Sequence, residues 1–96
     1  MTYKAFLRQI GDNIKLIREK ELGLTVNRAA QIALMRWTQL RDIENGLANP
    51  NMKTLYKIAK AFNVPIDRLF EIKKSQLDFL EPTIEDIKRA GRRLSN

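Results

Sequence analysis

Apolar side chains recur every three or four residues in five successive stretches of this chain, and three of these stretches end at Gly or Asn. The spacing places the apolar residues on one face of a helix, and no stretch shows the apolar-polar alternation of a half-buried strand. We therefore predict an all-α fold. The predicted helices cover residues 3–22, 25–33, 36–45, 52–62 and, briefly, 66–70.

Several residues at the ends of these helices are of the types that cap helices. Thr25 and Asn51 can accept hydrogen bonds from the free backbone amides of the second and fourth helices. Gly23 ends the first helix, and Asn45 with Gly46 is typical of a left-handed cap after the third. The breaks between the predicted helices therefore have a local chemical cause.

The chain divides into one domain and an extension. Residues 1–71 hold the five predicted helices and suffice for a single hydrophobic core. Residues 72–96 form a C-terminal extension, in which Thr83 and Asp86 resemble a capping box that opens a sixth helix. This helix is either exposed to solvent or the contact surface for a second copy or a partner protein. The apolar residues available for such a contact are Leu77, Phe79, Leu80, Ile84 and Ile87.

Composition excludes most catalytic chemistry. Histidine and cysteine are both absent, which excludes the common zinc sites and the Ser-His and Cys-His nucleophile pairs. The Asp and Glu residues lie among basic residues at helical spacing, which is typical of surface ion pairs rather than of a catalytic carboxylate pair. We expect no enzymatic activity, no cofactor and no metal. Without a long apolar stretch or the features of a signal peptide, the protein should be cytoplasmic, with no membrane partner.

Positive charge is concentrated in one part of the chain. The formal net charge is +7, and residues 1–62 hold 11 basic and 5 acidic groups, whereas residues 63–96 hold 7 and 6. A basic excess in one segment raises the local concentration of polyanions. It is therefore the first indication of a nucleic-acid partner.

The second and third predicted helices, residues 25–33 and 36–45, form the most informative unit. Only two or three residues join them, so their axes must cross at a large angle and the second helix of the pair projects as a ridge. A ridge of this width fits the DNA major groove, where Gln pairs with adenine, Arg with guanine or phosphate, and Asp with cytosine. The side chains that this helix offers are Arg36, Trp37, Thr38, Gln39, Arg41 and Asp42.

From about residue 10 to residue 70 the sequence resembles the Cro/C1-type (XRE-like) helix-turn-helix repressors. The stretches that carry the resemblance are IGDNIKLIRE, GLT, LRDIENG and NPNMKTLYKIAKAFNVPIDRLF. The resemblance implies a five-helix lambda-repressor-like DNA-binding domain from a bacterium or phage. It also implies a transcriptional repressor that binds double-stranded operator DNA as a homodimer, with two half-sites about one helical turn apart.

The resemblance further implies roles for individual residues. Arg18 and Glu44 would form a buried ion pair that ties the first helix to the third. Arg36 and Asn49 would contact phosphates, and Lys53 would approach the DNA backbone from the fourth helix. The groove-facing positions would be those of Trp37, Thr38 and Asp42, with Gln39 and Arg41 beside them.

The chain departs from the family pattern at four positions. Val26 stands where a Gln is common, and Arg36 where a Ser or Thr would cap the third helix. Leu34 replaces a common Gly, so we expect a turn conformation that is open to a side chain. Trp37 is apolar where a polar residue is usual. Its side chain either leans back and partly joins the core, contacts DNA sugar, phosphate or a thymine methyl, or serves a protein interface.

These departures leave a second function open. A protein-interaction adaptor or antitoxin-like module could keep the fold and bind a protein through the surface of Val26, Leu34 and Trp37. An exposed apolar patch around Trp37 favours the adaptor, whereas a buried Trp37 beside a continuous basic ridge favours DNA. Asp42 is expected to pair with a neighbouring arginine such as Arg41 rather than to read cytosine.

Overall fold

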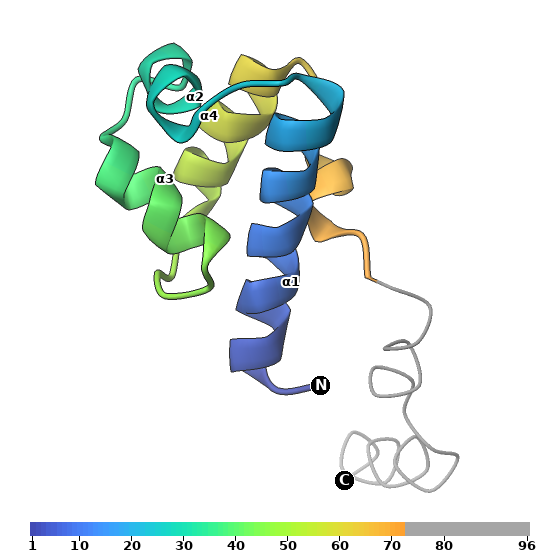
Figure 1. Ribbon diagram of the computed structural model, residues 1–96. Coiled ribbons are helices and arrows are strands. Elements are labelled where there is room, and N and C mark those ends of the chain that lie inside the picture. Colours follow the sequence, from blue (N-terminus) through green and yellow to red (C-terminus); the bar gives the residue numbers. More distant parts are fainter. Residues whose placement is uncertain (73–96) are drawn as a thin grey trace, which may run out of the picture.

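The computed structural model describes residues 1–72, and over that range every regular element is helical (Figure 1). The all-α prediction is therefore confirmed. The single predicted helix 3–22 divides into an α-helix and a π-helical turn, and the fifth predicted helix is a 3₁₀ helix. The sixth, predicted at Thr83, lies outside the described residues. The elements are α1 (Tyr3–Leu16), the π turn η1 (Ile17–Glu21), α2 (Val26–Ile32), α3 (Trp37–Glu44), α4 (Met52–Phe62) and the 3₁₀ helix η2 (Ile66–Phe70).

Three of the four α-helices begin at a residue whose side chain accepts a hydrogen bond from the backbone amide three residues ahead. The acceptors are Thr2 at 3.1 Å for α1, Thr25 at 3.1 Å for α2 and Asn51 at 2.8 Å for α4. The caps predicted at Thr25 and Asn51 are thus confirmed. α3 begins after Arg36, which makes no such bond. Its start is therefore held by packing rather than by a cap.

The helices α2, α3 and α4 all end at a residue with a left-handed backbone. These residues are Leu34 (φ 57°), Gly46 (φ 71°) and Asn63 (φ 55°). The amide that follows each of them bonds the carbonyl five residues back, at 2.9–3.0 Å, which is the Schellman motif. The expectation of a turn open to a side chain at Leu34 is therefore wrong. The hydrogen bonds that close α2 require a positive φ there, whichever residue occupies the position.

The core is built from one face of each element around α1. α1 packs against α3 on one side and against η2 on the other (Figure 1). Asn13 fastens η2 to α1, because its Nδ2 donates to the carbonyl oxygens of Leu69 at 2.9 Å and Glu71 at 2.7 Å. The largest fully buried side chains are Ile14, Ile17, Leu40, Ile58 and Leu69.

The strained backbone of Leu34 gives a first prediction. A left-handed backbone costs a residue with a Cβ roughly 1–2 kcal/mol, and glycine avoids this cost but loses roughly 0.5–1 kcal/mol of unfolded-state entropy. Because the Leu34 side chain is 81% exposed, its loss removes little burial. Leu34→Gly should therefore raise the free energy of unfolding by about 0.5–1 kcal/mol in urea denaturation. Leu34→Ala, which keeps the strain, should give no such gain; an equal gain from both would contradict the backbone explanation.

Candidate nucleic-acid interface

α3 lies directly on the backbone of α1. Gly11 faces it there: a Cβ built on Gly11 would come within 2.4 Å of the carbonyl oxygen of Ile43 and 2.5 Å of that of Glu44. At the end of α3, Gly46 approaches Arg8 in the same way, at 3.0 Å from a built Cβ to the Arg8 Cα. Glycine is thus required at position 11 for close approach, although the sequence patterns considered above did not single it out. Apolar periodicity reports which face is buried, not how closely two backbones approach.

A buried ion pair joins the same two parts of the chain. Arg18, in η1, donates from Nε and Nη2 to the two carboxylate oxygens of Glu44 at 2.7 and 2.9 Å, and both side chains are less than a tenth exposed. This is the pair that the family resemblance implied. The Arg18 Nη1 also donates to the carbonyl of Leu24 at 2.7 Å, so the loop before α2 is held as well. The hydrogen bond that Arg18 donates to Glu44 raises the pKa of Arg18 above its ordinary value, which keeps the guanidinium charged.

The two sides of α3 have opposite character. Leu40, Ile43 and Glu44 are buried against the domain, while the other side carries polar and basic groups. Among the residues predicted to contact DNA, Arg36, Trp37, Gln39 and Arg41 are exposed, and Thr38 and Asp42 are half-buried. All six predicted residues are therefore at least partly accessible to solvent.

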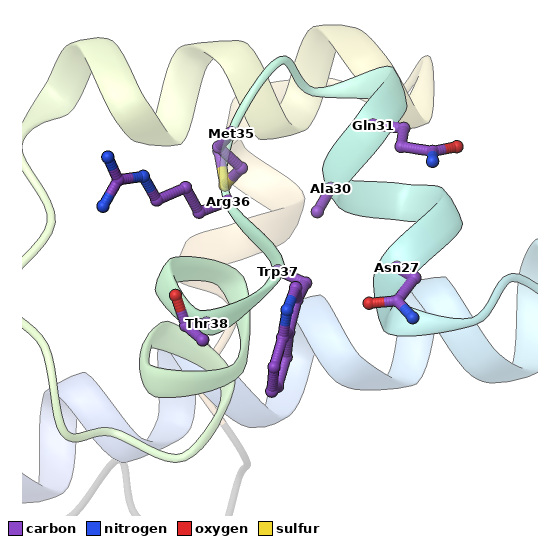
Figure 2. A pocket seen from close by; sticks show the side chains of 7 residues that line it. All are labelled: Asn27, Ala30, Gln31, Met35, Arg36, Trp37 and Thr38. Atoms are coloured by element: carbon purple, nitrogen blue, oxygen red, sulfur yellow. The ribbon is translucent and has the colours of Figure 1, made fainter.

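Trp37 does not join the core. The residue is 49% exposed, and its ring lies beside the first turn of α3 on the side that faces α2, where it lines a hollow together with Asn27 (Figure 2). Trp37 is therefore not a buried core residue, and its contacts with DNA or with a protein partner stay predictions. The hollow also brings two α2 residues, Asn27 and Gln31, beside the predicted set. The sequence interpretation missed them, although their i, i+4 spacing on an exposed helix face was a usable signal.

Arg41 is held in place by two neighbours. Its guanidinium carbon lies 5.0 Å from the centre of the Trp37 ring, and its Nε and Nη2 contact Asp42 Oδ1 at 3.3 and 3.2 Å. A cation over an aromatic face and an ion pair with the next residue together restrict the rotamers of the arginine. The expected pairing of Asp42 with Arg41 is present.

The two remaining predicted residues lie outside α3. Asn49, in the loop after α3, is exposed and accepts a hydrogen bond from the Tyr3 hydroxyl, which connects this loop to the start of α1. Lys53 is exposed in the first turn of α4. Within residues 1–72 neither Lys53 nor Arg36 forms an ion pair, so both charges are available to an anionic partner.

The described residues contain neither a metal-ligand cluster nor a membrane helix. Across residues 1–72, no three His, Cys, Asp or Glu side chains are grouped so that they could hold a metal ion. No helix in this range is both long and apolar enough to cross a bilayer.

α2 and α3 are two short helices joined by a tight turn, and α3 packs against the core on one side and carries polar groups on the other. This arrangement is a helix-turn-helix unit, the class found in DNA-binding domains. The helix-turn-helix family model HTH_3 matches residues 14–69. The chain belongs to this family, and the family resemblance found in the sequence is confirmed.

Solved structures agree with this assignment. An HTH_3 family transcriptional regulator from Vibrio cholerae is 30% identical with a TM-score of 0.67; the match covers 72% of this chain and 38% of that one. The restriction-modification controller protein C.AhdI from Aeromonas hydrophila is 21% identical with a TM-score of 0.66, covering 69% of this chain and 98% of the other. The second likeness shows the fold alone. A comparison with curated protein sequences gives no match.

The buried ion pair gives a second prediction. Glu44→Gln leaves the Arg18 charge buried without its partner, which should lower the free energy of unfolding by about 3–5 kcal/mol. Arg18→Met combined with Glu44→Leu removes both charges and should recover most of the loss. Urea denaturation measures both. As a control, Asp42→Ala breaks an exposed pair and should cost less than about 1 kcal/mol. A loss for Glu44→Gln no larger than this would contradict the role of the pair.

Gly11 gives a third prediction. Gly→Ala in a helix interior normally stabilises by roughly 1 kcal/mol, but here the added Cβ meets backbone oxygens that cannot move independently. Gly11→Ala should therefore lower the melting temperature and shift the amide resonances of α3. Asp12→Ala, at the neighbouring exposed position, should leave both unchanged. A stabilised Gly11→Ala protein would show that α1 and α3 are less closely packed than described.

Proposed function

We propose that this chain is a sequence-specific DNA-binding regulator of transcription, which acts in the cytoplasm as a repressor by occupying operator DNA as a homodimer. The observation that carries the proposal is the two-sided character of α3. Leu40 and Ile43 fasten the helix to the core, while Gln39 and Arg41 face solvent. A helix held in this way can enter the major groove without rearrangement of the domain.

Within this function, Arg41 is the best-placed reader of a base. Trp37 and Asp42 restrict its rotamers, so less conformational entropy is lost when its remaining N–H groups bind. The O6 and N7 atoms of guanine are the acceptors that suit an arginine in the major groove. We therefore propose that Arg41 reads guanine, with Gln39 suited to adenine.

Phosphate contacts would supply most of the affinity. Arg36 at the start of α3, Asn49 in the following loop and Lys53 at the start of α4 are exposed donors on three different segments. Contacts of this kind position a protein on the duplex without reading its sequence. They release counterions, so binding should weaken steeply as salt rises.

The similar Vibrio cholerae protein is a transcriptional regulator, which supports a regulatory role for this chain. This chain matches only 38% of the Vibrio cholerae protein, so the likeness concerns the shared domain. Repression and dimerisation are proposed for this chain because its sequence resembles the Cro/C1-type repressors.

The half-exposed Trp37 supports the adaptor as a second candidate, but three observations weigh against it. Arg41 lies over the Trp37 ring. Val26 packs partly against the core. Leu34 lines a different hollow from the one beside Trp37. The three residues therefore do not form the single apolar patch that an adaptor surface needs.

The fourth prediction separates base reading from phosphate contact. After duplexes have been selected from a random pool, Arg41→Ala should lose about 1–3 kcal/mol of discrimination at one guanine position, whereas Lys53→Ala should weaken all duplexes alike. Lys53→Ala should also make the dependence of log K on log salt shallower by about one. Gel shifts across a salt series measure both effects.

Two outcomes would contradict the proposal. If the wild-type protein forms no complex with any duplex at low salt, the adaptor function replaces DNA binding. If it binds all duplexes equally well, the protein binds DNA without operator recognition. Lys20→Ala, on the exposed side of η1, is a control that removes one positive charge away from α3 and should change neither measurement.

A further inference from the structure

A leucine at position 34 lowers the stability of the domain. Its backbone is left-handed, which favours glycine, and its side chain is 81% exposed, so burial in the domain does not offset the strain. Strained residues of this kind persist most often where a function needs them. The exposed leucine therefore indicates a contact outside the domain rather than a role in folding.

This leucine lines a groove at the C-terminal ends of α2 and α4. Two other large apolar residues line it, Ile32 and Tyr56, which are 40% and 57% exposed. Two cations border it: Lys57 donates from Nζ to the Leu34 carbonyl at 3.3 Å, and Lys60 lies 6.0 Å from the Tyr56 ring centre. We call this surface the α2/α4 groove; its main lining residues are Ile32, Leu34, Tyr56, Lys57, Lys60 and Ala61.

The apolar and basic side chains that line the groove favour a partner that is both apolar and acidic. Apolar side chains would cover Leu34 and Tyr56, and carboxylates would meet the two lysines. The C-terminal extension contains one segment of this composition. Residues 77–87, LDFLEPTIEDI, hold five large apolar residues and four of the eleven acidic residues of the chain, with no Lys or Arg. Basic residues border the segment on both sides.

We propose that residues 77–87 of a second copy of this chain bind in the α2/α4 groove. Four residues, 73–76, separate the segment from the described domain, and they span at most about 14 Å. The described chain leaves the domain after η2, on the side of α1 away from α2 (Figure 1). A neighbouring copy therefore reaches the groove more readily than the same chain does. This inference names the contact of the proposed homodimer and rests on that part of the proposed function.

The test is self-association of the full chain without DNA, measured by analytical ultracentrifugation over a range of concentrations. Wild-type protein should dimerise. Leu34→Gly, which is expected to fold at least as stably as wild type, should weaken dimerisation about tenfold or more, because it removes a buried leucine from the contact. Phe79→Ala should weaken it similarly. The double variant should be little worse than either single one, because the two residues would belong to one contact.

Charge and control variants sharpen the test. Lys60→Glu should weaken dimerisation, and adding Glu81→Lys should restore part of the loss. Leu47→Ala changes an exposed leucine outside the groove and should have no effect. A dimer insensitive to Leu34→Gly and Phe79→Ala, or additive losses from the two, would overturn the groove assignment while leaving the homodimer and DNA binding intact. A monomeric wild-type protein would reject the homodimer. If, in that case, Leu34→Gly made residues 77–87 more accessible to protease, the α2/α4 groove would be occupied by residues 77–87 of the same chain.

Discussion

The close contact of α1 with the C-terminal end of α3 is the constraint on which the rest of the domain depends. Because Gly11 has no side chain, the carbonyl oxygens of Ile43 and Glu44 can pack directly against the α1 backbone. Arg18 binds the Glu44 carboxylate at the same end of α3. Because a buried ion pair has strict geometry, it fixes the rotation of α3 as well as its position. The same contact therefore determines which residues of α3 face the core and which face solvent.

The arrangement of the exposed face follows from this rotation. Leu40 and Ile43 are buried, whereas Trp37 and Arg41 are exposed, and residues four apart are neighbours on a helix surface, so the guanidinium of Arg41 lies over the Trp37 ring. Trp37 is thus neither a core residue nor a bare apolar patch. Its ring lies under the Arg41 guanidinium, which explains how an apolar residue can stand on the polar side of α3.

Leu34 illustrates the opposite situation, in which local chemistry and structure disagree. The turn between α2 and α3 requires a left-handed residue, and the chain supplies a leucine instead of a glycine at a cost in stability. Such conflicts between local preference and global fold concentrate at functional surfaces. The strained leucine and the α2/α4 groove are therefore best understood together, as a surface whose purpose lies outside the single domain.

Periodicity and caps were enough to predict the helices and the turn between α2 and α3, because these features depend on neighbours a few residues away. The Arg18–Glu44 pair and the accessible residues of α3 were predicted from the motifs shared with the family. The approach of Gly11 to α3, the left-handed Leu34, the position of Asn27 beside Trp37 and the α2/α4 groove depend on residues far apart in the chain. Spacing along a sequence reports the face of a helix, but the distance and rotation between two helices are set by all their packed side chains at once. Only the tertiary structure could therefore decide them.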